Sequence, residues 1–199
     1  MPEATEPLST ETLQALADVG EGLGNGVVVV CGFPASGKSS SARYLAQHLA
    51  AVLLDKDGFA PGLEEAVMQE LTGNPHDRDS ALYRRVVGPN IYDALTRNAL
   101  HFGRYARVVV DAPYLEYVTA AAAAGVSLSE YIRAKSEVDV PVRTVWVAAD
   151  ADTIKQRMIS RGAERDLPKL EDWATYQRTV LDSGVALEAK AAVDHVVFN

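Results

Sequence analysis

The stretch that decides the fold is Gly32-Phe33-Pro34-Ala35-Ser36-Gly37-Lys38-Ser39, which matches the phosphate-binding pattern G-x-x-x-x-G-K-[ST] at every position. Residues 27–31 before it form a valine-rich run typical of a buried strand, and residues 40–51 after it follow the pattern of an amphipathic helix. A strand, a glycine loop and a helix in this order create an anion site, because backbone N–H groups of the loop and the helix N-terminus converge. The sequence therefore predicts that the chain binds a nucleoside triphosphate.

Each part of the motif has a predicted role. Gly32 and Gly37 allow a tight turn and a close approach of the backbone to phosphate. Lys38 is expected to reach the β- and γ-phosphates, and the hydroxyl of Ser39 is expected to bind Mg²⁺. The predicted nucleotide-binding residues of this region are Gly32, Pro34, Ala35, Ser36, Gly37, Lys38, Ser39 and Ser40.

The composition is typical of a single globular domain. A chain of 199 residues suffices for one well-cored α/β domain but not for two. The formal net charge of −8 argues against a nucleic-acid partner, which would need a basic stripe. The single cysteine, Cys31, excludes a disulfide framework and indicates a reducing compartment. With no visible secretion signal and no apolar run of about 20 residues, we expect a cytoplasmic protein, a monomer or homodimer that does not enter membranes.

Strand-like and helix-like segments alternate along the chain, which implies a mostly parallel sheet covered on both faces. Strands are predicted at 27–31, 52–55, 107–111, 144–147 and 193–198. Helices are predicted after Pro61 and at 79–102 (interrupted at Gly88-Pro89), 116–124, 128–137, 151–161 and 170–192 (with a break at Gly184). We predict a tail and a short helix over 1–25, capped by Ser9 or Thr10, and one domain over 26–199. Within that domain the charged segment 162–169 is predicted to be a mobile loop, so that a lid lies around 161–169.

Two aspartates follow the second strand-like run, in Leu54-Asp55-Lys56-Asp57-Gly58. Side chains two residues apart in an extended segment point the same way, so both carboxylates should project from the carboxyl end of a strand, where α/β sheets bind ligands. Asp55 is placed to hold Mg²⁺, and Asp57 to accept or orient the proton of a substrate hydroxyl. A structural alternative stays open, because either carboxylate also suits capping of the next helix or pairing with Lys56.

A third aspartate, Asp111, ends the run 107–111, where a metal-binding carboxylate of the Walker-B type would lie. The alternative is a turn residue before Pro113. The next residue is Ala112, whereas motor ATPases commonly place a water-activating glutamate there, and this weakens a hydrolase interpretation.

Three arginines follow within nine residues. Arg157 and Arg161 share one face of the predicted helix 151–161, and Arg165 lies in the charged segment. Phosphoryl transfer depends on positioning and charge neutralisation, and a mobile loop that carries arginine can close over a triphosphate. We therefore predict that Lys38, Asp57, Arg161 and Arg165 are catalytic. The alternative is that the arginines complement the helix dipole.

Together these residues resemble the small-molecule kinase branch of the P-loop proteins, which includes shikimate and gluconate kinases, adenylate kinase and chloramphenicol phosphotransferase, and especially the bacterial AAA-type ATP-binding kinases. The resemblance extends from residue 27 to about residue 177. Its carriers are the motif 32–39, Asp55-Lys56-Asp57, Val110-Asp111-Ala112-Pro113, the segment 156–161, Arg165-Asp166, Lys169-Leu170 and Asp172-Trp173. It implies an α/β fold of the P-loop NTPase type, a three-layer α/β/α sandwich with a five-stranded parallel sheet of order 2-3-1-4-5.

The resemblance also implies ATP and Mg²⁺ as cofactors. In such kinases the first aspartate of D-x-D helps to hold magnesium and the second contacts the accepting hydroxyl, which corresponds to Asp55 and Asp57. The first arginine of R-x-x-x-R stacks on adenine and the second meets phosphates, which corresponds to Arg157 and Arg161. The predicted metal ligands are Ser39, Asp55 and Asp111. Many relatives continue past the fifth strand into a loop that touches adenine, whereas this chain ends at Asn199, so that side of the base pocket is expected to be open or formed otherwise.

The leading prediction is transfer of the γ-phosphate of ATP to a hydroxyl of a small molecule, such as a sugar, an aminosugar, an antibiotic or a biosynthetic intermediate. Acceptor recognition is expected from 59–72, Arg84-Arg85, Tyr114 and Glu116, although surface acidity also explains Glu116. The sequence selects no particular acceptor. Two alternatives are a nucleoside or polynucleotide 5′-hydroxyl kinase and a nucleotide-dependent switch or ATPase without an acceptor.

Overall fold

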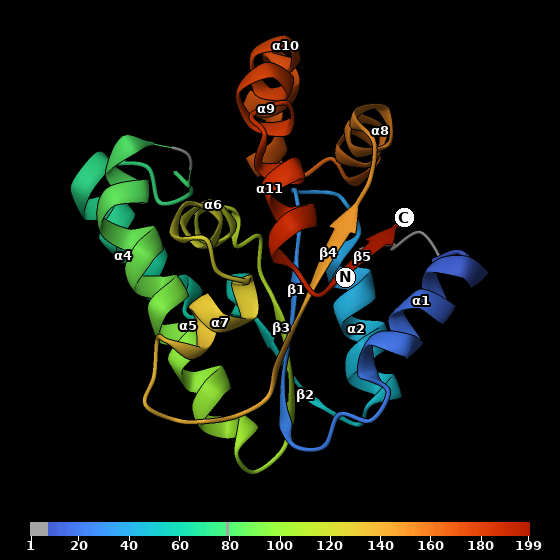
Figure 1. Cartoon of the computed structure of the whole chain (residues 1–199). Coiled ribbons are helices and arrows are strands. Elements are labelled where there is room, and N and C mark those ends of the chain that lie inside the picture. The colour runs from blue at the N-terminus through green and yellow to red at the C-terminus, as the bar shows by residue number, and fades with distance from the viewer. Residues whose placement is uncertain (1–7, 79) are drawn as a thin grey trace.

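A computed structural model describes residues 8–78 and 80–199, with the backbone but not the side chain of residue 165. Five parallel strands form one sheet in the order β2-β3-β1-β4-β5 (Figure 1). The strands are β1 (Gly26–Cys31), β2 (Val52–Asp55), β3 (Arg107–Asp111), β4 (Val142–Ala148) and β5 (His195–Phe198). The predicted α/β fold and its strand order are confirmed.

The central strand β1 separates two hydrophobic cores. Val27, Val29 and Cys31 face one core, whereas Val28 and Val30 face the other. A strand covered on both faces buries every side chain, which explains why this run is apolar throughout rather than alternating. The end of β1 is thereby fixed on both sides, and the phosphate-binding loop starts from a rigid base.

Two helices, α1 (Thr10–Gly20) and α2 (Lys38–His48), cover one face of the sheet (Figure 1). Ser9 caps α1 as expected, because its side chain accepts the N–H of Thr12. Leu16 and Val19 are fully buried, and the Thr12 hydroxyl donates a 2.8 Å hydrogen bond to the carbonyl oxygen of Phe198. The short N-terminal helix thus packs directly on the sheet domain, and the expected boundary at residue 25 stays a prediction.

Four helices cover the opposite face, completing three layers. They are α5 (Gly88–Gly103), α6 (Leu115–Ala124), α7 (Leu128–Arg133) and α11 (Val185–Ala192). Helix α7 begins with a capping box, in which Ser127 and Glu130 exchange side-chain and backbone hydrogen bonds.

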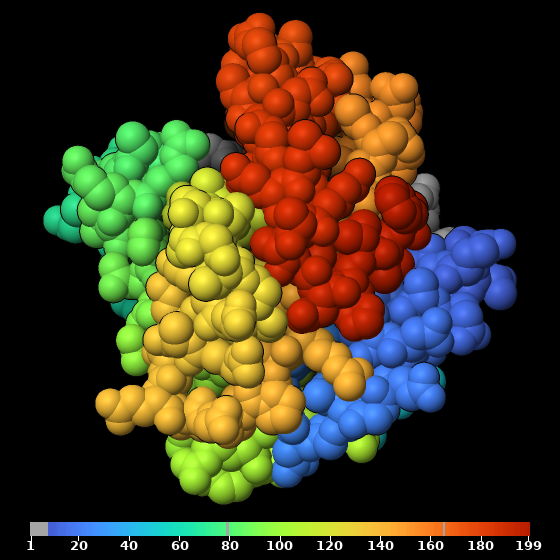
Figure 2. Space-filling model, in the orientation of Figure 1, coloured from blue at the N-terminus to red at the C-terminus, as the bar shows by residue number. Residues whose placement is uncertain are grey.

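Two groups of helices rise beyond the carboxyl ends of the strands, and Figure 2 shows them apart at the top of the molecule. We call the described residues of 56–87 the α4 arm; it contains α3 (Lys56–Phe59), α4 (Pro61–Thr72) and the π-helix η1 (Tyr83–Val87). We call residues 151–181 the α9 arm; it contains α8 (Ala151–Arg161), η2 (Glu164–Asp166), α9 (Leu167–Glu171), α10 (Trp173–Tyr176) and the π-helix η3 (Gln177–Leu181).

The predicted loop at 162–169 is wrong in its local structure. Residues 164–169 form the 3₁₀ turn η2 and the first three residues of α9, and only 162–163 lie outside both. Pro168 fits the first turn of a helix, where its missing N–H has no partner to lose. The predicted helix 170–192 has a second break, at Asp172, and the helix predicted at 128–137 ends at Arg133. The expected interruption at Gly88-Pro89 is a change from π-helix to α-helix; residue 79, where that helix was expected to begin, lies outside the described residues.

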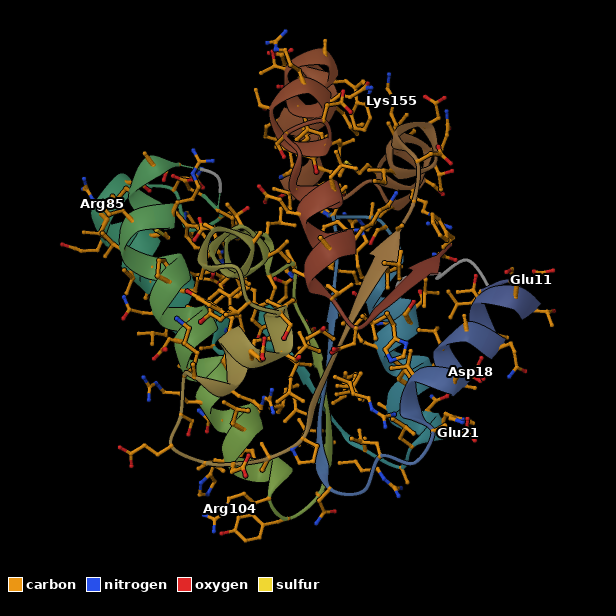
Figure 3. All side chains as sticks on the ribbon, in the orientation of Figure 1. Glu11, Asp18, Glu21, Arg85, Arg104 and Lys155 are labelled. Atoms are coloured by element: carbon orange, nitrogen blue, oxygen red, sulfur yellow. The ribbon has the colours of Figure 1, made fainter. Side chains whose placement is uncertain are left out.

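Several charged side chains lie on the outer surfaces of helices. Figure 3 shows Glu11, Asp18 and Glu21 on the outer side of α1, and Arg85 on the outer side of the α4 arm. Within residues 8–78 and 80–199, no helix combines the length and the apolar character that crossing a membrane requires.

Candidate active site

A cleft of about 1480 Å³ opens at the carboxyl ends of the strands and is lined by the phosphate-binding loop and by both arms. It brings together most of the residues predicted for the site, namely Pro34, Ala35, Gly37, Lys38, Ser39, Ser40, Asp55, Asp57, Asp111, Arg157 and Arg161. Gly32 and Ser36 belong to the same loop, and Ser36 is fully buried. The side chain of the predicted Arg165 lies outside the described residues. Residues as far apart in the sequence as Pro34 and Arg161 therefore meet in one place.

The loop has the close-packed geometry that its glycines predict. Gly32 and Gly37 have φ values of 143° and 101°. A Cβ atom on Gly32 would lie 2.6 Å from the carbonyl oxygen of Val147. Gly37 is the N-cap of α2 and has no side chain, so within the described part of the chain no side-chain cap bonds the first-turn N–H groups. These donors suit a phosphate.

Two side chains from distant parts of the chain hold the loop. The carbonyl oxygen of Ser36 accepts hydrogen bonds from Nη1 of Arg157 at 3.2 Å and from Nδ2 of Asn199 at 3.0 Å. The backbone N–H of Asn199 in turn donates to the carbonyl oxygen of Ala148, at the end of β4. The carbonyl is therefore anchored to α8 and to the sheet.

Lys38 lies buried under the loop, where its Nζ donates a 2.9 Å hydrogen bond to the carbonyl oxygen of Phe33. Burial lowers the pKa of Lys38, whereas the charges of Asp111 and Asp57 oppose this shift and that of Arg161 adds to it. Lys38 is thus within electrostatic reach of three residues predicted for the site.

The three aspartates lie at neighbouring strand ends. Asp55 on β2 pairs in register with Asp111 on β3, and Asp111 is buried. Asp55 caps α3 by accepting the N–H of Asp57, and Asp57 pairs with Nζ of Lys56 at 3.5 Å. Both structural alternatives are therefore present, yet all three carboxylates line the cleft.

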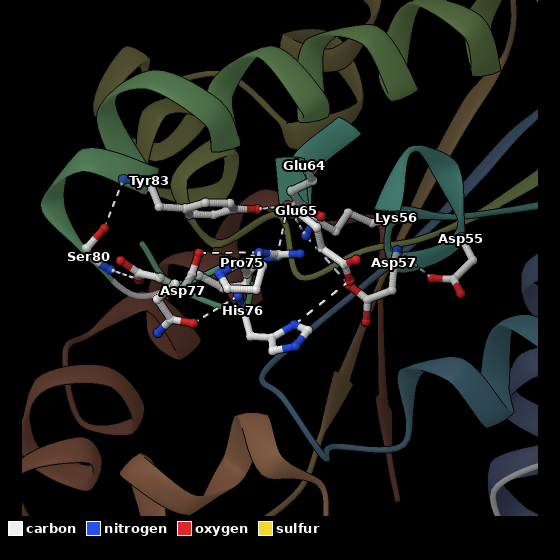
Figure 4. A network of polar contacts seen from close by, with 12 residues as sticks. Asp55, Lys56, Asp57, Glu64, Glu65, Pro75, His76, Asp77, Ser80 and Tyr83 are labelled. Atoms are coloured by element: carbon white, nitrogen blue, oxygen red, sulfur yellow. Dashed lines mark hydrogen bonds and ion pairs between the residues drawn. The ribbon is translucent and has the colours of Figure 1, made fainter. Parts of the chain in front are cut away.

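Next to Asp57 lies a buried polar network that the sequence analysis missed (Figure 4). Glu64, only 3% exposed, receives three donors on one oxygen, Oε1. They are Nζ of Lys56 at 2.8 Å, Nε of Arg78 at 3.2 Å and the hydroxyl of Tyr83. Burial raises the pKa of Tyr83, and its hydrogen bond to Glu64 raises it further.

Tyrosines line the cleft beyond Asp57. The rings of Tyr92 and Tyr114 meet edge to face at 5.3 Å, and those of Tyr114 and Tyr117 at 5.0 Å. Tyr114 is almost fully buried, and its hydroxyl shares a 2.9 Å hydrogen bond with Thr96. Burial raises the pKa of Tyr92 well above its usual value, and the negative charge of Asp57 contributes to that rise.

The residues predicted to recognise the acceptor separate into two groups. Glu116, Tyr114 and Arg84 line the cleft. Arg85 does not line the cleft, and Figure 3 shows it pointing outward from the α4 arm. Of the predicted segment 59–72, the residues that line the cleft are Pro61, Glu64 and Glu65.

Arg161 is bound to a buried carboxylate. Its Nε and Nη2 donate to Oδ2 of Asp166 at 2.9 and 2.6 Å, and Asp166 is 2% exposed. This pair ties the end of α8 to η2, so the segment predicted as a lid is joined to a predicted catalytic residue. The sequence analysis named Asp166 only as part of the resemblance and did not predict its pairing with Arg161.

The residues described contain no cluster of three or more histidine, cysteine, aspartate or glutamate side chains spaced to hold a metal ion. Magnesium in phosphate-transfer sites is held by one or two carboxylates together with water and substrate phosphate, so it needs no such cluster. Ser39, Asp55 and Asp111 offer oxygen donors of the kind that Mg²⁺ prefers, at the mouth of the phosphate-binding loop.

The missed residues share one property. Glu64, Arg78 and Tyr83 lie 8 to 27 positions from Lys56, and Asn199 lies 163 positions from Ser36. Each looks like an ordinary surface residue in sequence, because no motif links them. The one available signal is Lys56 itself, since a lysine between two aspartates needs a partner wherever it is buried.

Similarity to known proteins identifies the family of the chain and its fold. None of the curated proteins matches the chain. Among solved structures, a "putative kinase" from Chloroflexus aurantiacus has 17% sequence identity and a TM-score of 0.51, covering 89% of this chain and 86% of that one. The shikimate kinase from Acinetobacter baumannii has 15% identity and a TM-score of 0.41, covering 91% of this chain and 86% of its own. The model of the AAA domain family (AAA_33) matches residues 27–181, and the chain therefore belongs to this family of P-loop kinases.

Proposed function

We propose that the protein uses ATP and Mg²⁺ to phosphorylate a hydroxyl group of a small molecule. The observation that carries this proposal is the position of Asp57. Its carboxylate lines the same cleft as Lys38, and its charge acts on Lys38 on one side and on Tyr83 and Tyr92 on the other. A carboxylate between a phosphate site and an aromatic-walled half of the cleft suits an acceptor hydroxyl.

The residues of the loop fit a triphosphate. The tight approach at Gly32, the first turn of α2, which no described side chain caps, and the buried Lys38 support this assignment, because phosphates bind such donors. Ser39, Asp55 and Asp111 would hold the magnesium ion. When bound, MgATP supplies the phosphoryl group that is transferred.

The remaining roles follow from what each side chain can do. Asp57 accepts the proton of the acceptor hydroxyl or orients it, which requires an exposed carboxylate within the cleft. Its side chain is 54% exposed. Arg161 neutralises negative charge beside Lys38, and Asp166 fixes the direction of its guanidinium. Tyr92, Tyr117 and Glu116 form the side of the cleft on which the acceptor binds.

The test is ADP release with MgATP against sugars, aminosugars, nucleosides and hydroxyl-bearing antibiotics, with a control lacking acceptor. We expect one class to stimulate release, with a phosphorylated product seen by mass spectrometry. In Asp57→Asn, ATP binding should persist while transfer falls by at least about 100-fold, within the range for loss of a general base. Asp139→Asn is the matched control, because Asp139 is an exposed aspartate outside the cleft.

Equal ADP release in every well would contradict the proposal and favour an acceptor-independent ATPase. Full transfer activity in Asp57→Asn would remove Asp57 from the mechanism while leaving the kinase itself intact. Stimulation by a nucleoside alone would shift the acceptor class to the 5′-hydroxyl of nucleosides.

A further inference from the structure

The structure holds Lys56 between two carboxylates that differ in burial. Nζ of Lys56 lies 2.8 Å from Oε1 of Glu64 and 3.5 Å from Oδ1 of Asp57. The Glu64 side chain is 3% exposed, whereas that of Asp57 is 54% exposed. The contact with Glu64 is shorter and more buried, so it is the stronger one. Lys56 is therefore held by Glu64 and makes a weaker ion pair with Asp57.

The charges around Glu64 explain why Lys56 stays in contact with it. Glu64 also receives Nε of Arg78 and the hydroxyl of Tyr83 on the same oxygen. Two cations therefore surround one buried anion, and Asp57 supplies the second negative charge of the group. A buried ion pair is costly when either partner is removed, which keeps Lys56 at this position.

From this geometry we infer that Glu64 and Lys56 are positioning residues for Asp57, an inference that rests on the proposed function. Glu64 holds Lys56 back from full contact with Asp57. The ammonium thereby fixes the direction of the Asp57 carboxylate by a looser ion pair and leaves that carboxylate exposed to the acceptor half of the cleft. Without the charge of Glu64, Lys56 would move toward Asp57 and cover the oxygen that receives the proton.

The decisive experiment is a pair of double-mutant cycles, Glu64→Gln with Asp57→Asn and Lys56→Met with Asp57→Asn. Each single and double variant is measured for urea-unfolding midpoint, ATP affinity and acceptor-dependent kcat. We expect Glu64→Gln and Lys56→Met to lower kcat by about 10- to 100-fold, since a misplacement of about 1 Å can cost the larger factor. ATP affinity should change less than about twofold, and Lys56→Arg, which keeps the charge, should recover part of the lost kcat.

The coupling between the Glu64 and Asp57 substitutions shows whether Glu64 positions Asp57 or only stabilises the fold. In the Asp57→Asn background, Glu64→Gln should no longer lower the residual kcat, because the carboxylate through which it acts is gone. Asp194→Asn is the stability control. Asp194 precedes β5, does not line the cleft and accepts hydrogen bonds from Thr144 and Ser129, so this variant should unfold earlier with kcat unchanged.

The urea-unfolding midpoints can be measured without any acceptor. If Lys56 links Glu64 to Asp57, the shift in urea midpoint caused by Asp57→Asn must differ between wild type and Glu64→Gln. Equal shifts, or an unchanged kcat in Glu64→Gln, would overturn the inference. Failure of every acceptor to stimulate wild type would instead refute the proposed function, and the midpoints would still decide whether Glu64 and Asp57 are coupled. If Glu64→Gln does not fold, Lys56→Met and Lys56→Arg give the same decision.

Discussion

Replacing Gly32 by alanine tests whether the close approach of the loop to β4 matters for nucleotide binding. The added Cβ would lie 2.6 Å from the carbonyl oxygen of Val147 and 3.0 Å from Oγ of Ser36, and a backbone oxygen cannot rotate away. Backbone strain at φ 143° costs about 1–3 kcal/mol, and overpacking costs about 1–3 kcal/mol more. A protein of this size loses about 2–4 °C of Tm per kcal/mol. We therefore expect Tm to fall by at least about 4 °C.

The clash also moves the phosphate-binding donors, so the Kd for ATP should rise by at least about tenfold, equivalent to 1.4 kcal/mol. Calorimetric titration and thermal unfolding measure both effects. Gly22→Ala is the matched control, because Gly22 has a φ of 68° but no heavy atom of the described residues within 4 Å of the added Cβ. If Gly32→Ala and Gly22→Ala lower Tm equally and leave the Kd for ATP unchanged, the argument from close approach is refuted.

Three further predictions concern buried groups. Lys38→Met should abolish acceptor-dependent ADP release, because it removes the ammonium that we expect to bind the β- and γ-phosphates; measurable turnover would exclude Lys38 from transfer. Arg161→Ala should lower kcat by about 100-fold or more and destabilise the fold by about 3–5 kcal/mol, because Asp166 is left buried without its partner. Arg161→Ala with Asp166→Asn should recover stability but not kcat, and recovery of both would make Arg161 structural. Burial raises the pKa of the Cys31 thiol from 9.0 to about 12, so the stability that depends on a neutral thiol should be lost as pH rises from about 9 toward 12. Urea midpoints at pH 7.5 and 10 should fall less in Cys31→Ala than in wild type, and equal losses would contradict this.

Local patterns predicted most of the fold. The valine run of β1, the glycine loop and the start of α2 follow from hydrophobic periodicity and from the geometry of the motif, and the structure has all three. The loop predicted at 162–169 is wrong in its local structure because charged residues and proline also occur in the first turn of a helix. Pro168 stands where a helix accepts it, and Asp166 is buried by pairing with Arg161. The two residues are only five positions apart, but they pair because the chain turns back after α8 at Gly162, which has a left-handed conformation.

The meeting of the site residues in one cleft was predictable from the sequence, whereas the buried network next to Asp57 was not, and the roles of these residues stay predictions. Lys38, Ser39 and Asp111 come from one motif and one strand end, so their meeting follows from topology. The network around Glu64 depends on how α4 and the following residues fold over α3. Nothing in the spacing of Lys56, Glu64 and Tyr83 specifies that packing.

The two hydrogen bonds that hold the carbonyl oxygen of Ser36 have a consequence for the thermodynamics of ligand capture. Because Arg157 and Asn199 already restrict the loop, a nucleotide that arrives does not have to order it, and the entropy loss on association stays small. Removing the Asn199 amide would leave every phosphate donor in place and still make association entropically less favourable. The phosphate-binding loop is therefore ordered when the chain folds, before a ligand binds.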